Sequence, residues 1–322
     1  MKACLFFSKV RDMDKIELKS YAKINLCLDV KGVLENGFHE VEMVMQQILL
    51  CDDISASWES RPGHDLEISL TTNRRYLPVD ERNLAYKAAL LMKEEYGYDI
   101  GGTLRIAIKK RIPVAAGLAG GSGNGAAVLH ALNRLWNLGL GVSDICQTGS
   151  RLGSDVPFCV MGQAAENAEL KEMFADDPLA CHCALATGRG TELKPLQGLK
   201  SHLVLSKPPI SVSTAEVYKG IDSIEITERP NASEMIQGLA TGDLELVGKN
   251  MVNVLENFTL KKYPIVVYTK NNIQSACDTQ AVLMSGSGPS VFGLCSSMEQ
   301  SKAACVTLSK INKESFWTRT TF

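Results

Sequence analysis

Five glycines and a serine within nine residues are the feature that most constrains this chain. They lie between Gly117 and Gly125, after Pro113 and before an alanine-rich stretch that predicts a helix. Glycine allows positive φ and lets a ligand approach the main chain closely. Free N–H groups at the start of a helix bind anions, and the helix dipole favours negative charge there. The run therefore predicts a phosphate-binding loop rather than a turn that only permits close packing.

Two common phosphate loops do not fit this run. No Gly-Lys-Ser/Thr ending is present, which excludes a Walker A loop. The segment from Gly121 to Ala126 loosely fits the dinucleotide fingerprint. That fingerprint follows a strand directly, and a second strand ends in an acidic residue about 20 residues later. Here a long loop with Pro113 intervenes and the downstream stretch reads as helix, so a dinucleotide fold is disfavoured.

The composition is that of a soluble globular protein, and it excludes several classes of partner. The 322 residues are 45% hydrophobic and 22% charged, which favours two domains. The net charge is −2 and no basic stripe is present, so we expect no nucleic acid. No apolar run approaches the roughly 20 residues that cross a bilayer, so we expect no membrane contact. Residues 1–12 are too interrupted for a signal peptide, and they precede a domain that begins near Met13.

The ten cysteines are scattered without a Cys-x-x-Cys pair, which indicates a reduced, cytoplasmic protein. Cys181, His182 and Cys183 look like metal ligands at first sight. Residues so close together do not easily close a tetrahedral zinc site without further ligands. We therefore expect no metal bound by protein side chains alone.

Periodicity predicts a different architecture for each half of the chain. In the first half, strands are expected over 16–19, 24–30, 41–50, 65–70 and 104–108, and helices over 83–96, after the glycine run and over 143–152. In the second half, strands are expected over 203–205, 281–284, 290–294 and 316–320, and helices over 213–221, 232–239, 244–255, 264–277 and 299–311. The second pattern indicates an antiparallel sheet with helices on one face.

Four further motifs accompany the glycine run, at 22–26, 37–39, 153–158 and 284–292. In this order the chain resembles the GHMP kinase superfamily, named for galactokinase, homoserine kinase, mevalonate kinase and phosphomevalonate kinase. The resemblance implies a two-domain α/β (α+β) fold with the site between the domains. It implies a ribosomal S5-like N-terminal domain over 14–163 and a ferredoxin-like C-terminal domain over 184–322. Between them, 164–183 reads as a polar insertion, which we expect to be a dispensable surface excursion.

The resemblance also implies transfer of the γ-phosphoryl group of ATP, with Mg²⁺, to a hydroxyl of a small molecule by a monomer or homodimer. The ATP-binding residues that it implies are Asn83, Lys110, Pro113, Val114, Ala115, Ala116, Gly117, Leu118, Ala119, Gly120, Gly121, Ser122 and Gly123. Asn83 is equally suited to cap a helix. Relatives more often have Ser and Ala at the positions of Gly123 and Gly125, which puts one phosphate or Mg²⁺ contact in doubt.

Lys23 and Asp155 match the family's catalytic pair. A carboxylate within hydrogen-bond reach can orient a hydroxyl and accept its proton. A neighbouring lysine favours the ionised carboxylate and stabilises developing charge. The alternatives are a surface lysine at a strand edge and an aspartate that caps a turn between a helix and a strand.

Asn25, Phe38 and His39 match substrate-binding positions of a superfamily branch whose substrate carries cytosine. An aromatic ring there can stack on the base, and His39 can read its edge. Phe38 stands where relatives often carry Tyr, which keeps stacking and loses a phenol hydrogen bond. The alternative is a Phe-His pair that only packs in a small core. Other small-molecule kinases and a non-catalytic nucleotide-binding protein stay open as rival functions.

Overall fold

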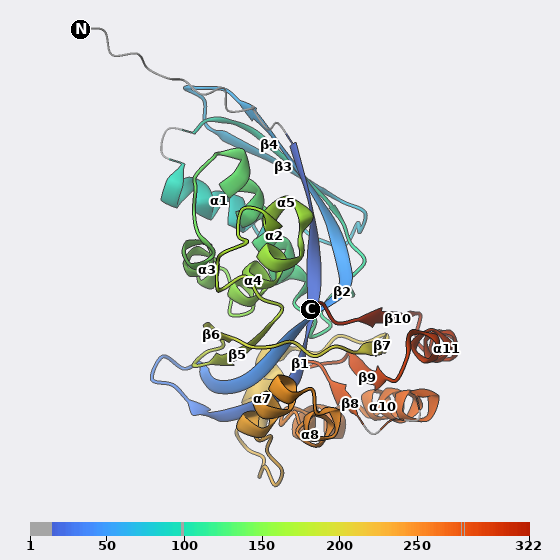
Figure 1. Ribbon diagram of the computed structural model, residues 1–322. Coiled ribbons are helices and arrows are strands. Elements are labelled where there is room, and N and C mark those ends of the chain that lie inside the picture. Colours follow the sequence, from blue (N-terminus) through green and yellow to red (C-terminus); the bar gives the residue numbers. More distant parts are fainter. Residues whose placement is uncertain (1–14, 98–99, 278, 280) are drawn as a thin grey trace, which may run out of the picture.

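The computed structural model describes residues 15–97, 100–277, 279 and 281–322, which form two sheets with their helices (Figure 1). The segment before Lys15, with the expected domain start near Met13, lies outside these residues. Figure 1 shows most of one sheet, with its helices, in the upper part and the other sheet with its helices below. This two-domain α/β arrangement is the expected fold class.

The first sheet has six strands in the order β3-β4-β2-β5-β6, with β1 paired to the other edge of β2. Its strands are β1 (Lys15–Val33), β2 (His39–Ser60), β3 (Leu66–Thr72), β4 (Gly102–Lys109), β5 (Cys183–Thr187) and β6 (Glu192–Pro195). Its helices are α1 (Leu84–Tyr96), α2 (Gly120–Leu135), α3 (Val142–Ser150), α4 (Val156–Glu166) and α5 (Ala168–Lys171), and they lie on one side of it (Figure 1). β5 pairs with β2 although the expected boundary at residue 184 assigns it to the second domain.

The second sheet is antiparallel, in the order β10-β7-β9-β8. Its strands are β7 (His202–Lys207), β8 (Val282–Met284), β9 (Val291–Cys295) and β10 (Glu314–Arg319). The helices of this half are α6 (Thr214–Ile221), α7 (Ala232–Thr241), α8 (Leu244–Lys249), α9 (Glu256–Lys262), α10 (Pro264–Cys277) and α11 (Met298–Leu308). Along the chain this half runs strand, helices, two strands, helix and strand. Together with the sheet order β10-β7-β9-β8, this is the ferredoxin-like topology.

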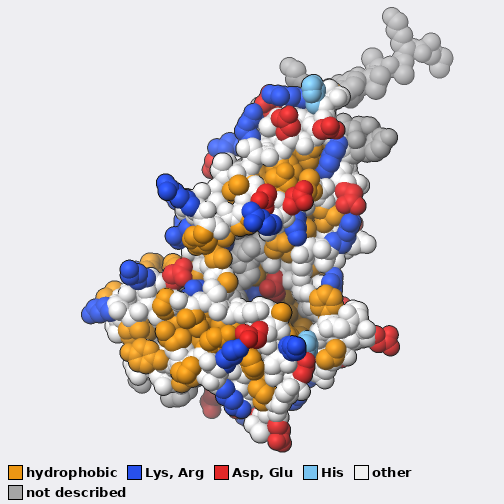
Figure 2. Space-filling model, turned by 180° about the vertical axis from the view of Figure 1, so that it is seen from behind, with side chains coloured by type: hydrophobic (Ala, Val, Ile, Leu, Met, Phe, Trp, Pro, Cys, Tyr) orange, Lys and Arg blue, Asp and Glu red, His pale blue; other side chains and the backbone are white. Residues whose placement is uncertain are grey.

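The surface mixes charges of both signs. On the face shown in Figure 2, Lys and Arg side chains lie among Asp and Glu, and hydrophobic side chains gather over the lower part. Among the residues that the structure describes, no helix is long and apolar enough to cross a membrane.

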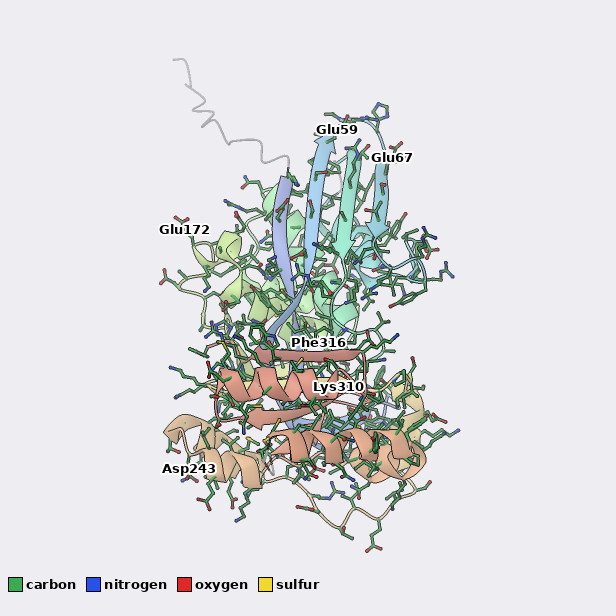
Figure 3. All side chains as sticks on the ribbon, turned by 90° about the vertical axis from the view of Figure 1, so that its right-hand side faces the viewer. Glu59, Glu67, Glu172, Asp243, Lys310 and Phe316 are labelled. Atoms are coloured by element: carbon green, nitrogen blue, oxygen red, sulfur yellow. The ribbon has the colours of Figure 1, made fainter. Side chains whose placement is uncertain are left out.

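β1 is one continuous strand, whereas the sequence predicts two. Its pairing with β2 shifts register between Tyr21 and Ala22, and such irregularities change which face a side chain occupies. Ile16 and Leu18, before the shift, pack in the core under the helices. Ala22, Ile24 and Leu26, after the shift, pack with side chains of the second sheet. Phe316 on β10 joins this second cluster, and Figure 3 shows it at the opposite end of the first sheet from Glu59 and Glu67.

Two further interpretations of secondary structure are wrong. The alternative for Asp155, a turn between a helix and a strand, does not hold, because the segment after Asp155 is α4. Its first nine residues are all buried, so no periodicity separates helix from strand, while Pro157 suits a helix start. The helix expected over 244–255 ends at Lys249. Beyond it the chain pairs with β1, because Leu28 N–H donates to Val252 O and Val254 N–H donates to Leu28 O.

The expectation that 164–183 is a solvated excursion is also wrong. Asn167 is buried, and its amide exchanges two hydrogen bonds with the Lys19 backbone, at 2.7 and 2.9 Å. Leu170 and Phe174 are buried in the core under the helices. The polar residues that suggested a loop alternate with these anchors, because one face of the segment is exposed and the other packs.

Phe174→Ala is expected to lower the free energy of unfolding by about 3–5 kcal/mol, since it removes a buried ring and leaves a cavity. The matched control is Met173→Ala, because Met173 is 38% exposed. Urea unfolding of both variants measures the difference. An equal, small loss in the two variants would show that the segment is a surface excursion after all.

The free energy of unfolding should fall below neutral pH because of His130. This side chain is fully buried, its Nε2 lies 3.0 Å from Val160 O, and burial lowers its pKa to about 4. Between pH 4 and 6.5 the unfolded chain therefore binds a proton that the folded chain does not. The expected loss from His130 between pH 7 and pH 5 is about 2 kcal/mol. Urea unfolding at both pH values should show a smaller loss for His130→Gln, and an unchanged loss would contradict this assignment.

Candidate active site

The glycine run forms a strained loop that ends at the first turn of α2. Ala115, Gly117 and Ala119 all have positive φ, at 51°, 72° and 54°. Alanine rarely adopts this conformation, so the surrounding contacts must hold it. The first helical hydrogen bond runs from Gly123 N–H to Ala119 O at 2.8 Å. The N–H groups before it have no partner within the helix, and the first turn carries no acidic residue. This geometry suits a phosphate.

Three of the sequence motifs meet at Gly117 and Leu118. Lys23 N–H on β1 donates to Leu118 O at 3.2 Å. Ser285, in the motif after β8, donates its hydroxyl to Gly117 O at 2.9 Å. A Cβ at Gly117 would lie 2.0 Å from Ser285 O, so only glycine permits this approach. The loop is therefore fixed against both the first sheet and the second domain.

Lys23 and Asp155 lie together beside this loop. Lys23 is 4% exposed, and its Nζ lies 3.7 Å from Asp155 Oδ1 and donates to Asn25 Oδ1 at 2.8 Å. Lys23 is therefore not a surface lysine. Asp155 precedes α4, yet its side chain makes no capping hydrogen bond and is one-third exposed. The carboxylate is therefore free to meet a ligand, while Asn25, fully buried, fixes the ammonium.

Phe38 and His39 lie at the turn between β1 and β2. Phe38 is 51% exposed and the Arg189 guanidinium lies 5.7 Å from its ring centroid, so the ring does not pack in a core. His39 Nε2 lies 2.8 Å from Asp222 Oδ1, directly after α6. The hairpin thus reaches the second domain and presents an open aromatic face beside a histidine.

Tyr218 is a residue of this region that sequence reasoning missed. Its ring centroid lies 5.0 Å from that of His39. Burial raises its pKa, and the negative charge of Asp155 adds to the effect. Tyr218 and Asp222 are four residues apart and share one face of α6. That spacing was the available signal, but nothing in the sequence placed α6 opposite the hairpin.

Comparison with known proteins places this arrangement in a family. The model of the GHMP kinases N terminal domain matches residues 83–163, and that of the GHMP kinases C terminal domain matches 235–310. The 4-diphosphocytidyl-2-C-methyl-D-erythritol kinase of Alkaliphilus metalliredigens is 43% identical over 303 residues, which cover 94% of this chain and 95% of that protein. The chain belongs to the 4-diphosphocytidyl-2-C-methyl-D-erythritol kinase family. It is therefore an ATP-dependent small-molecule kinase.

Solved structures agree with this assignment. The crystal structure of a 4-(cytidine 5'-diphospho)-2C-methyl-D-erythritol kinase has a TM-score of 0.74 and 28% identity, and the match covers 95% of this chain and all of that one. A homoserine kinase from Cytophaga hutchinsonii has a TM-score of 0.68 at 18% identity, with 99% of this chain and 97% of that chain covered. The second likeness supports the GHMP kinase fold alone.

The structure accounts for the two glycines in which this kinase chain departs from the pattern expected for the family. A Cβ at Gly123 would lie 2.6 Å from Ser20 Oγ, so a serine there would displace the Ser20 side chain. A Cβ at Gly125 would lie 3.4 Å from Leu84 O, which is a tight contact with the start of α1. Both glycines therefore allow α2 to pack closely against neighbouring elements.

The two expected nucleotide-binding side chains outside the loop are already engaged. Asn83 caps α1, since its Oδ1 accepts from Ala85 N–H at 3.0 Å and its amide donates to Pro78 O. The ammonium of Lys110 is bound to Asp52 and is 4% exposed. Lys110 still borders the loop, because a Cβ at Gly120 would lie 2.6 Å from Lys110 Nζ. Their expected contact with ATP stays a prediction.

No protein-only metal site is found in the part of the chain that the structure describes, where no three His, Cys, Asp or Glu side chains gather suitably. Cys181 donates to Cys183 O, and burial raises its pKa to about 11, so it does not favour the thiolate that metals bind. A groove of about 530 Å³ lies over the other face of the first sheet, lined by residues such as Lys19, Asp53 and Lys109. It contains none of the expected site residues.

Proposed function

We propose that the chain transfers the γ-phosphoryl group of ATP to the 2-hydroxyl of 4-diphosphocytidyl-2-C-methyl-D-erythritol, a step of non-mevalonate isoprenoid precursor synthesis. The observation that carries the proposal is the Lys23–Asp155 pair, at 3.7 Å, between a phosphate-type loop and an exposed aromatic-histidine hairpin. The names of the relatives support the same substrate. Production of the phosphorylated compound from ATP by the purified protein is the direct test.

The phosphates of ATP would meet the free N–H groups of Gly120, Gly121 and Ser122. These groups lie at the positive end of the α2 dipole, which favours a polyanion. Mg²⁺ would neutralise charge on the β- and γ-phosphates, and it takes most of its ligands from phosphates and water. Ser122 carries the loop hydroxyl that suits such an ion.

The acceptor hydroxyl would lie at Asp155, whose carboxylate orients it and accepts its proton as the new O–P bond forms. The bond between the γ-phosphorus and the β–γ bridging oxygen would break at the same time, and ADP would leave with that oxygen. Lys23 Nζ, held by Asn25, would place a positive charge beside the transferred group. The chemistry relies on position and charge and needs no covalent intermediate on the protein.

The cytosine would stack on Phe38, with its edge toward His39. This hairpin separates the proposal from mevalonate and homoserine kinases, whose substrates carry no base. We further infer that the enzyme acts in the cytoplasm without nucleic acid, as a monomer or homodimer.

Asp155→Asn is expected to reduce kcat by about 10²–10⁴-fold while ATP still binds, because the amide cannot accept the proton. Steady-state kinetics and calorimetric ATP titration measure the two effects. Near-normal turnover of the folded variant would remove Asp155 from the mechanism.

Phe38→Ala is expected to weaken binding of the cytidine substrate by about 1–3 kcal/mol, the usual contribution of stacking on one base. ATP affinity should barely change, because the side chain is exposed on the hairpin rather than packed in the core. Titration with each ligand separates these effects. An equal loss for both would place Phe38 in the structural core and contradict the substrate assignment.

A further inference from the structure

A buried carboxylate, Asp52 on β2, joins the two ends of the phosphate loop. It is fully buried and accepts hydrogen bonds from Arg111 N–H at 2.7 Å and Ile112 N–H at 2.8 Å. Its other oxygen binds the Lys110 ammonium and accepts from Asn124 Nδ2 at 2.9 Å. The first three contacts lie just before the loop, and Asn124 lies in the first turns of α2, just after it.

The same amide continues the link to β1. Asn124 Nδ2 also lies 3.1 Å from Ser20 Oγ, and Asn124 is 3% exposed. The Lys110 backbone N–H donates to Asn73 Oδ1 at 2.8 Å, which fixes the same segment from the side of β3. The loop therefore begins and ends on one polar network within the first domain.

Stability alone does not explain this buried polar network. Burial lowers the pKa of Lys110, which shows that the site disfavours the charge that it holds. Apolar side chains of similar volume often serve stability as well as a buried ion pair does. A carboxylate, however, can accept from several donors in fixed directions, and the loop contains two alanines in the left-handed region that need such support.

We propose that Asp52 is a positioning residue that holds the phosphate loop in its ATP-binding conformation through Asn124 and the backbone at 111–112. The proposal rests on the role of the loop given under Proposed function. Asp52 itself is fully buried and acts through the loop, because it holds the segment before the loop and Asn124 after it. Loss of its contacts should therefore weaken the binding of ATP and leave the binding of the cytidine substrate unchanged.

Asn124→Ala tests the link to α2 without leaving a buried charge alone, because Asp52 keeps Lys110 and both backbone donors. Alanine favours helix, so α2 should still form. The expected result is an increase of about ten-fold in the Kd of ATP, since small displacements of bound groups are costly. The Kd of the cytidine substrate should stay within two-fold. Calorimetric titration with each ligand measures both values.

Asn133→Ala is the matched control on the same helix. Asn133 is also buried and makes two hydrogen bonds with the Leu140 backbone, at 2.9 and 3.0 Å, far from the loop. It should lower the melting temperature without changing the Kd of ATP. Asp52→Asn provides a second variant, and Asp53→Asn is its control, because Asp53 binds Lys19 and Arg111 near the surface.

The results of these experiments distinguish a failure of the role proposed for Asp52 from a failure of the proposed function. Gly121→Asp places a carboxylate in the first turn of α2, where Gly121 is exposed and a Cβ meets only Leu84 at 3.7 Å. It suits the helix dipole but repels phosphate. If Gly121→Asp leaves ATP affinity intact, the loop is not the phosphate site and the proposed function is wrong there. Asp52 is not a positioning residue if Gly121→Asp weakens ATP binding while Asn124→Ala and Asp52→Asn leave it unchanged. The same conclusion follows if Asn124→Ala and Asp52→Asn weaken the binding of ATP and of the cytidine substrate equally.

Discussion

The long pairing of β1 with β2 is the constraint on which the rest of the molecule depends. Over its first residues β1 covers one core, and beyond the register shift at Tyr21 it is buried on both faces, between the helices of the first domain and the second sheet. Lys23 and Asn25 lie in this doubly covered part, which explains how a lysine is held almost without exposure to water. The second domain therefore supplies one wall around the strand that carries the lysine.

Much of the fold could be predicted from the sequence because local signals agreed with tertiary packing. Asn83 marks the start of α1 and does cap it, and the glycine run does end in a helix. Apart from α9, which was not predicted, the second half follows the strand and helix order expected from its apolar periodicity. Lys23 and Asp155, 132 positions apart in the numbering, could be paired only through the family resemblance. Spacing in one sequence does not bring such residues together.

The interpretations of the sequence that were wrong or incomplete share a physical cause. The run after Asp155 is buried on every side, so helix and strand periods cannot be told apart. The segment 164–183 looked polar because its anchors, Asn167, Leu170 and Phe174, are few among charged neighbours. The family resemblance implies that Lys110 binds ATP, and only the fold shows that it is buried against Asp52. Each case depends on what packs against a segment, which local pattern does not contain.

The glycine loop and the Phe38–His39 hairpin are supported differently, which agrees with the ligands proposed for each. The phosphate loop is held by backbone and buried polar contacts on three sides, because the N–H groups of a polyanion site must be oriented before the ligand arrives. The base region joins an exposed hairpin to α6 through His39 and Asp222, so it spans both domains with few contacts. Elements with few buried contacts open at low free energy. We therefore expect the hairpin and α6 to separate more easily than the contacts that hold the loop.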